Sequence, residues 1–393
     1  MTPRRTTAAV VGVIALGTAV RLLLAFSTYG VAYDIDSLQI VGRLLREEPT
    51  ELYAAMRWPY PGGYLPVAAA ADVAAARTGV PFHGIVQLPA VLADAVLAGL
   101  VAVVLRSRGH TSGRVVVGAA VVALSPLTVI VTGYHGQIDA VAALLAFAGL
   151  AVWTTRLRHR VFLAGVLIGL AGSVKQPLLF TVLALLPTTT GVRQRAVLLA
   201  AAALPPAVSL LPFLVMDPGS VLSALSAHGG VPGFGGLSAA IDPALPRAWA
   251  TLKGSPEPSA ATLALVDAGP VLVAAGAVLA GAVLVRRRAA PFQAAATIWL
   301  VVAAVNPNPA YQYLLWGLPV LVVVLGARPL AALVVLSSTG ALLLYARPDL
   351  SDGGWTYVVV ALSLWVLQLW LAVQAIARPR DTLPSTHPSA TTS

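Results

Sequence analysis

Long runs of apolar residues, each interrupted by few or no charges, recur along this chain of 393 residues. Apolar residues make up 58% of it, and the mean hydropathy of +0.85 leaves too little polar surface for a water-soluble domain. Inside hydrocarbon every backbone N–H and C=O group has to be paired within the protein, so only helices and closed barrels cross a membrane. The runs are continuous rather than alternating, which favours helices over strands. The sequence therefore predicts an all-α fold, a polytopic transmembrane helical bundle.

The apolar runs also predict where the chain crosses the membrane. A crossing helix needs about 20 apolar residues, or fewer where neighbouring helices shelter it. We expect about twelve spans, near residues 7–27, 84–105, 115–132, 138–155, 161–174, 177–190, 195–215, 262–285, 292–305, 311–327, 330–346 and 355–376. The two longest connections, 28–83 and 216–261, form a first and a second outer loop. We interpret residues 1–376 as a single transmembrane domain, and 377–393, rich in Pro, Ser and Thr, as a disordered cytoplasmic tail.

The charged residues predict which side of the membrane each loop faces, because cytoplasmic loops carry an excess of Lys and Arg. One side of the twelve-span arrangement receives Arg4, Arg5, Arg106, Arg108, Arg114, Arg156, Arg158, Arg160, Arg193, Arg195, Arg286, Arg287, Arg288, Arg328, Arg378 and Arg380. The other side receives nearly all the carboxylates, so we expect both termini in the cytoplasm of a plasma-membrane protein. We assign the formal charge of +10 to these loops rather than to a nucleic-acid site, and no cysteine is present to form a disulfide.

Two acidic residues, Asp34 and Asp36, follow the first expected span at its outer end. A carboxylate at or within the membrane is costly to keep ionised, which makes it a candidate for function. The alternative is a solvated pair, with Asp36 as the N-cap of the helix that follows. In that helix, over 37–48, the Leu and Val residues share one face, which suits a helix lying on the membrane surface. Segment 62–78 fits either a second surface helix or a short re-entrant span.

A second polar cluster, His135, Gln137 and Asp139 in HGQID, lies at the outer end of the fourth expected span. The alternative role for Asp139 is to cap the start of that helix. Lys175 stands in SVKQP between two short spans and is one of only two lysines in the chain. A lone Lys there either contributes to a site or extends its ammonium group to the interface. Two weaker candidates lie in a Gly-rich outer stretch and at a span entrance, His228 and Gln312.

Taken in order, these motifs resemble those of the GT-C glycosyltransferases, polytopic enzymes that use sugars linked to lipid phosphates. YDIDSLQ with the later WPYPGGYLP resembles their first outer loop, where an acidic residue precedes a Tyr-Pro-Pro-Gly-Tyr-like turn. HGQID, VKQPLLFTVLALLP and NPNPAYQYLLWGLP resemble stretches of the dolichyl-phosphate-glucose glucosyltransferases. The chain thus resembles these enzymes and related bacterial mannosyltransferases. The chain departs from that pattern in reading Pro-Gly-Gly for Pro-Pro-Gly and Asp139 for Asn.

The resemblance implies roles for individual residues. It implies that Asp34 is the general base that deprotonates the acceptor hydroxyl, with Asp36 orienting the acceptor or sharing the role. It implies that a cation stabilises the departing phosphate, with Lys175 as the first candidate and His135 or Arg43 beside it. The residues implied to contact the sugar or the acceptor are Gln137, Asp139, Gln176, Tyr60, Tyr64, His228 and Gln312. The same resemblance implies an inverting displacement.

The sequence thus predicts a membrane glycosyltransferase that moves mannose, glucose or arabinose from a polyprenyl-phosphate donor to a lipid- or glycan-linked acceptor at the outer face. Membrane lipid is an expected partner, and nucleic acid is not. No cofactor is expected, although two carboxylates at i and i+2 are able to ligate a divalent ion. The alternative is a multi-span transporter or lipid flippase, with ionisable residues near broken helices. Transporters usually show paired halves, whereas here the polar motifs concentrate in the first half, which favours the enzyme.

Overall fold

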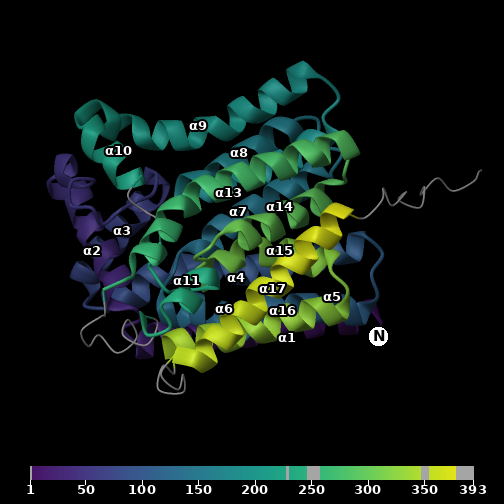
Figure 1. The fold of residues 1–393 in the computed structure, drawn as a ribbon, viewed down its shortest axis with the longest axis horizontal. Helices are drawn as coiled ribbons and strands as arrows, with labels where there is room; N and C mark the ends of the chain where they lie inside the picture. The colour runs from purple at the N-terminus through teal and green to yellow at the C-terminus, as the bar shows by residue number, and fades with distance from the viewer. Residues whose placement is uncertain (1, 227–229, 246–256, 347–353, 378–393) are drawn as a thin grey trace, which may run out of the picture.

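The computed structural model describes residues 2–226, 230–245, 257–346 and 354–377, and every regular element in these ranges is a helix (Figure 1). The first half contains α1 (Pro3–Ser27), α2 (Ala32–Glu47), η1 (Pro49–Glu51), η2 (Gly62–Tyr64), α3 (Leu65–Thr78), α4 (Phe82–Ser107), α5 (Ser112–Leu124), α6 (Pro126–Val129), η3 (Ile130–His135), α7 (Asp139–Trp153), α8 (Arg160–Val174), η4 (Gln176–Ala184) and η5 (Leu186–Thr188). The second half contains α9 (Val192–Met216), α10 (Pro218–Ser226), α11 (Gly236–Ile241), α13 (Ala260–Arg287), α14 (Pro291–Val305), η6 (Tyr311–Tyr313), α15 (Leu314–Val324), α16 (Ala327–Ala341), η7 (Leu342–Ala346) and α17 (Trp355–Ala377). The all-α prediction is confirmed for this part of the chain. His228 and all but the first residue of the expected tail lie outside the described residues.

Seven helical segments are long and apolar enough to cross a membrane: α1, α4, α5 to η3, α9, α13, α16 to η7, and α17. In α1, α9, α13 and α17, only 22–28% of the most apolar window is buried inside the protein. Their remaining apolar side chains face outward, which in water would expose a large hydrophobic surface but is stable against lipid tails. These four helices therefore form part of the surface that faces the membrane.

Five shorter apolar helical segments occupy the remaining expected spans: α7, α8, η4 to η5, α14, and η6 to α15. Most residues of α14 are buried, and α13, α17 and α15 all pack against it. A helix enclosed by other helices does not have to match the thickness of the lipid by its own length. Every expected span thus coincides with a helical segment, while the count of twelve crossings stays a prediction.

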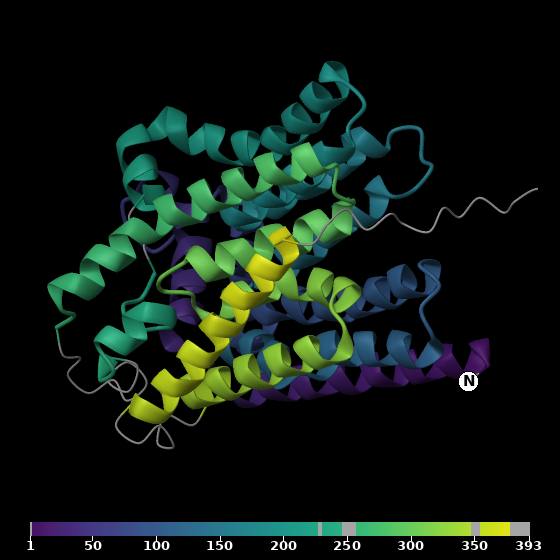
Figure 2. The same ribbon diagram turned by 45° about the vertical axis from the view of Figure 1, so that its right-hand side comes forward.

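The helices pack in a row from one edge of the molecule to the other. The order of contacts is α9, α8, α7, α4 and α1, and α5 packs against both α1 and α4. Figures 1 and 2 show α9 along one edge and α1 along the opposite edge, with α7 and α4 between them. Asp139 at the start of α7 and Lys175 at the end of α8 are two of the polar residues described below.

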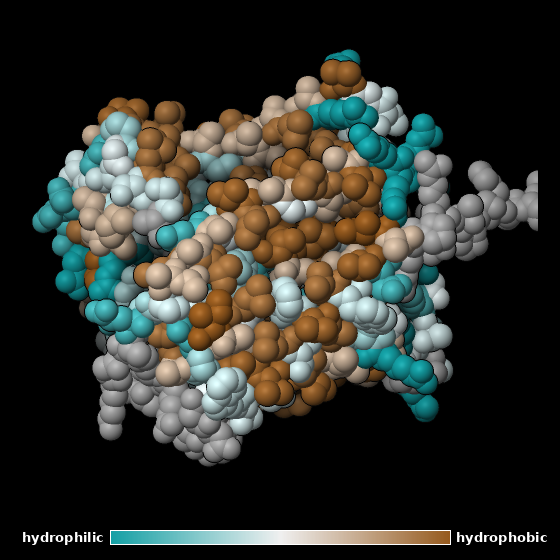
Figure 3. Space-filling model, in the orientation of Figure 1, coloured by the Kyte–Doolittle hydropathy of each residue, from teal (hydrophilic) through white to brown (hydrophobic). Residues whose placement is uncertain are grey.

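The two ends of the bundle differ in what they carry. The connections between α4 and α5, between α7 and α8, and between α13 and α14, all rich in arginine, lie at one end, and α2, α3, α10 and α11 lie at the other (Figure 1). Figure 3 shows hydrophilic residues gathered at these two ends with hydrophobic residues between them. This separation agrees with the expected positive-inside arrangement, although which end faces the cytoplasm stays a prediction.

The expected amphipathic helix of the first loop is α2, but its apolar face packs against protein. Val41 is fully buried, and a Cβ on Gly42 would come within 2.7 Å of the Ala68 carbonyl oxygen in α3. The prediction that this face lies on the membrane is therefore wrong, because α3 covers it. The helix begins at Ala32, so Asp36 lies inside it and the N-cap interpretation is also wrong.

Candidate active site

Five polar side chains from separate elements form one connected chain at the α2 end of the bundle. Nε2 of His135 lies 2.6 Å from Oδ2 of Asp34 and 3.1 Å from Nε2 of Gln137. Nζ of Lys175 lies 3.4 Å from Oε1 of Gln137 and 3.4 Å from Oδ2 of Asp139. An ionised carboxylate has no proton to donate, so the proton between His135 and Asp34 belongs to Nε2 of the histidine. That nitrogen then has no lone pair for Gln137, and the side-chain amide N–H of Gln137 donates to the Asp34 carboxylate instead. The structure thus brings together candidates that stand up to 141 positions apart in the sequence, from 34 to 175.

The backbone around His135 joins the start of α2 to the end of η3. The N–H group of Val31 donates to the His135 carbonyl oxygen at 3.2 Å. The next residue, Gly136, has φ +86°, in the left-handed region that glycine adopts without a Cβ clash. A Cβ at this position would also lie 2.6 Å from Cδ1 of Ile35 in α2. Glycine is therefore required for α2 to approach His135 closely.

The centre of the polar chain is a buried ion pair between Lys175 and Asp139, whose exposed fractions are 1% and 0%. Trp316 of α15 donates its Nε1–H to Oδ1 of Asp139 at 2.5 Å, and Nζ of Lys175 lies 3.8 Å from the centroid of the Tyr60 ring. Asp139 is the first residue of α7 but makes no capping hydrogen bond, so the capping interpretation is wrong. Lys175 is enclosed at the junction of α8 and η4, so it does not extend to the interface.

Asp34 is the member of the chain that remains accessible, since about a third of its side chain (34%) is exposed. Burial of the carboxyl raises its pKa, but the hydrogen bond from His135 and the positive charges of His135 and Lys175 outweigh that effect and hold the pKa below the ordinary aspartate range. The carboxylate therefore stays ionised and able to accept a proton over a wide pH range.

Two cavities meet beside these residues. The first, here called the polar cavity, measures about 320 Å³, and Asp34, Gln137, Lys175 and Tyr60 are among its walls. The second, here called the apolar groove, measures about 440 Å³. Its walls include Tyr60, Gln176, Phe180, Val273, Trp299, Leu300, Trp316 and Gln368. Tyr60 lines both, so a molecule with a polar head and a long apolar tail is able to occupy the two together.

The helix that carries His135 is broken between α5 and α6, and the break frees two backbone carbonyls. Pro126 has no N–H group, so the Val122 carbonyl lacks its helical donor. The N–H of Leu127 donates to Oγ of Ser338 at 3.2 Å, so it does not serve the Ala123 carbonyl. Both carbonyls are buried in the bundle, where an unpaired polar group is costly.

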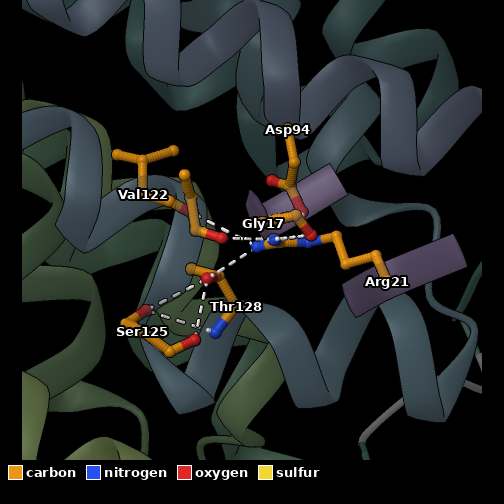
Figure 4. A network of polar contacts seen from close by, with 7 residues as sticks. Gly17, Arg21, Asp94, Val122, Ser125 and Thr128 are labelled. Carbon is orange, nitrogen blue, oxygen red and sulfur yellow. Dashed lines mark hydrogen bonds and ion pairs between the residues drawn. The ribbon is translucent and has the colours of Figure 1, made fainter. Parts of the chain in front are cut away.

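Arg21 of α1 supplies the missing donors (Figure 4). Its guanidinium group donates to the carbonyl oxygens of Val122, at 3.2 Å, and of Ala123, and to Oγ1 of Thr128 at 2.8 Å. Its Nε lies 2.9 Å from Oδ2 of Asp94 in α4, and both side chains are almost fully buried. The charge is thus balanced within the membrane segment, and α1, α4 and the broken helix are joined at one point.

Several candidates from the sequence lie outside the polar chain. Asp36 accepts a hydrogen bond from the Tyr29 hydroxyl at 2.6 Å. Arg43 is exposed on α2 and lines neither cavity. Tyr64 is buried and donates to the Val86 carbonyl oxygen at 3.0 Å, as a packing residue does. None of these three therefore borders the polar cavity.

Two further candidates border the site from outside. Nε2 of Gln176 donates to the Pro59 carbonyl oxygen at 3.0 Å, and its side chain lines the apolar groove. Gln312 accepts a hydrogen bond from the Tyr345 hydroxyl at 2.7 Å, and the Tyr345 ring lies 4.4 Å from the His135 ring, centroid to centroid. Gln312 therefore reaches the site only through Tyr345.

Sequence reasoning missed Arg57, Trp316 and Tyr345. Trp316 lies within the stretch NPNPAYQYLLWGLP and Arg57 directly precedes WPYPGGYLP, so nearness to a motif was the available signal for both.

Within the described ranges no group of three or more His, Cys, Asp or Glu residues is arranged to hold a metal ion. Asp34 and Asp36 also diverge, because residues i and i+2 of a helix point to different sides, and so they do not form a shared site.

The sequence model of glycosyltransferase family 87 matches residues 58–307, more than half of the chain. The chain belongs to glycosyltransferase family 87. This is a GT-C type family, so the resemblance to that class of membrane glycosyltransferases is confirmed. A search among curated proteins found no match.

A solved structure of the apo oligosaccharyltransferase from Archaeoglobus fulgidus is similar to this family 87 chain. The two are 13% identical, with a TM-score of 0.44, over 94% of this chain and 56% of that one. The chain thus spans little more than half the length of that protein. The family match itself contains Tyr60, His135, Asp139 and Lys175 and begins after Asp34, so the base candidate rests on geometry rather than on the matched segment.

Proposed function

We propose that this family 87 glycosyltransferase transfers mannose, glucose or arabinose from a polyprenyl-phosphate donor to a lipid- or glycan-linked acceptor. The observation that supports this most is Asp34, a partly exposed carboxylate that is held by His135 on the wall of a cavity that joins an apolar groove. An enzyme of this class needs such a base beside a place for a lipid-linked sugar. The family favours this enzyme over a transporter or flippase, the alternative that the sequence left open.

In the proposed reaction Asp34 takes the proton of the acceptor hydroxyl as its oxygen bonds to the anomeric carbon of the donor sugar. The bond from that carbon to the phosphate oxygen breaks at the same time, and the electron pair leaves with the polyprenyl phosphate. His135 holds the carboxylate of Asp34 through a hydrogen bond from Nε2. Attack opposite the leaving phosphate inverts the anomeric centre.

Lys175 is the proposed partner of the phosphate. Asp139 balances the charge of Lys175 in the free enzyme. Lys175 lines the polar cavity, and Asp139 lies directly behind it. As the phosphate gains negative charge, an ammonium group that is already desolvated interacts with it more strongly than one in water. We assign the polyprenyl chain to the apolar groove, since Tyr60 borders both spaces.

The proposal places the site at the outer face of the plasma membrane, within a single transmembrane domain over 1–376. The support is charge: the arginine-rich loops lie at the end of the bundle opposite to α2 and α3 (Figure 1). Both termini are then cytoplasmic. The outer loops are 28–83 and 216–261, and the second includes residues outside the described ranges.

The test is transfer by purified protein in lipid nanodiscs, with polyprenyl-phosphate mannose, glucose and arabinose offered in turn and a membrane lipid extract as acceptor. Asp34→Asn keeps the shape but removes the basic lone pair, so turnover falls by about 10²-fold or more. Asp36→Asn is the matched control on the same helix and costs less, because Asp36 contacts Tyr29 rather than the cavity. Consumption of a nucleotide sugar in place of all three donors refutes the proposal, as does an Asp34→Asn variant with normal turnover.

A further inference from the structure

The polar cavity has a second cationic wall residue, Arg57, which the reaction above does not use. Its guanidinium carbon lies 4.6 Å from the centroid of the Tyr33 ring, and Nη1 donates to Oγ of Ser37 at 3.4 Å. Among the described residues no carboxylate lies within ion-pair distance of Arg57, whereas Lys175 has Asp139 at 3.4 Å. The protein therefore balances one cation of the cavity and leaves the other for a ligand.

Arg57 is presented by a rigid turn. Met56, just before it, has φ +52°, a left-handed conformation that a residue with a Cβ rarely adopts. Trp58, just after it, is buried and donates to the Pro61 carbonyl oxygen at 3.1 Å. Such strain persists where surrounding contacts hold it, and it recurs at ligand clamps. The backbone of Arg57 is thus held in place before any ligand arrives.

Arg57 lies on the side of the polar cavity that α2 forms. Its contacts, Tyr33 and Ser37, lie on α2 on either side of Asp34, the proposed base. Lys175 lies instead beside Tyr60, the residue shared with the apolar groove. A cavity of about 320 Å³ is at the small end of ligand pockets. A group that meets Arg57 is therefore close to the hydroxyl that Asp34 deprotonates.

We propose that Arg57 binds an anionic group of the acceptor, a carboxylate or a phosphate carried near the hydroxyl that receives the sugar. The acceptor is then an acidic glycolipid or glycan. A guanidinium group suits this role because its planar pair of N–H donors matches two oxygens of either anion and stays charged at any working pH. The inference rests on the proposed function, since it names the acceptor class for the same cavity.

The first experiment asks whether the product is charged. Wild-type protein transfers radiolabelled sugar, from whichever polyprenyl-phosphate donor it consumes, into a membrane lipid extract that is then separated on an anion-exchange column. The labelled product is retained as an anion. A neutral labelled product overturns the inference while leaving the proposed function intact, and a donor that is not consumed refutes the proposed function.

The second experiment asks whether Arg57 recognises the negative charge of the acceptor. Hexyl glucuronide and hexyl glucoside serve as acceptors that differ in one carboxylate, and Arg57→Gln, Arg57→Lys and Arg43→Gln are compared with wild type. Arg57→Gln raises the KM for hexyl glucuronide at least tenfold and leaves the KM values for hexyl glucoside and for the donor within twofold of wild type. Arg57→Lys restores part of the affinity for hexyl glucuronide. Arg43→Gln, an exposed cation on α2 outside the cavity, changes none of these. An equal effect on both acceptors, a raised donor KM, or no effect overturns the inference.

Discussion

Loss of Arg21 is expected to destabilise the protein, and a second substitution at its ion-pair partner, Asp94, is expected to restore part of the stability. Arg21→Met leaves Asp94 buried without its cation, which costs about 3–5 kcal/mol. It also leaves the carbonyls of Val122 and Ala123 without donors, at about 1–3 kcal/mol each. The sum, about 5–11 kcal/mol, approaches the whole stability of an ordinary protein. The single variant is therefore expected to yield little folded protein.

The double variant Arg21→Met/Asp94→Leu removes the uncompensated charge and keeps only the carbonyl cost of about 2–6 kcal/mol. We expect it to be more stable than the single variant and less stable than wild type. The measurement is reversible unfolding of each variant in mixed detergent micelles, followed by tryptophan fluorescence, with the folded fraction checked by gel filtration.

Arg114→Met is the control for this comparison. Arg114 also donates to two carbonyl oxygens, those of Val322 at 2.5 Å and Leu325 at 2.6 Å, but it is only half-buried. Water at the end of the bundle replaces its donors, so the loss is about 1–2 kcal/mol. A double variant no more stable than the single one, or an Arg114→Met variant that loses as much as Arg21→Met, would show the assignment of these energies to be mistaken.

Three further predictions concern chemistry and topology. Lys175→Met raises the donor KM or lowers turnover in folded protein, and donor kinetics within twofold of wild type would exclude a phosphate-binding role. The rate needs ionised Asp34, whose pKa is lowered, so the acid limb of the kcat/KM profile lies below the ordinary aspartate range. His135→Ala removes a contact that lowers the pKa of Asp34 while the burial that raises it persists, so the acid limb moves to higher pH. An acid limb that does not move contradicts the role given to His135. A reporter inserted near Arg158 is expected in the cytoplasm and one near Asp217 outside, and the same location for both refutes the topology.

The sequence by itself determined the class of this protein. Continuous apolar runs leave helices as the only stable form in lipid, so the positions of helical segments followed from composition along the chain. The motifs around Asp34, His135 and Lys175 pointed to the residues that the fold brings together. These inferences succeed because they depend on local properties: hydropathy over about twenty residues, and the cost of a charge next to hydrocarbon.

Only the tertiary structure decided what each side chain faces. Asp34 and Asp36 are equivalent in the sequence, but the start of α2 at Ala32 and the approach of η3 turn Asp34 towards His135, 101 positions away. In the same way Arg57 rather than Arg43 borders the cavity. Directions of this kind depend on packing between segments that are distant in the chain, and a one-residue change in where a helix starts rotates every side chain by about 100°. No local pattern contains that information.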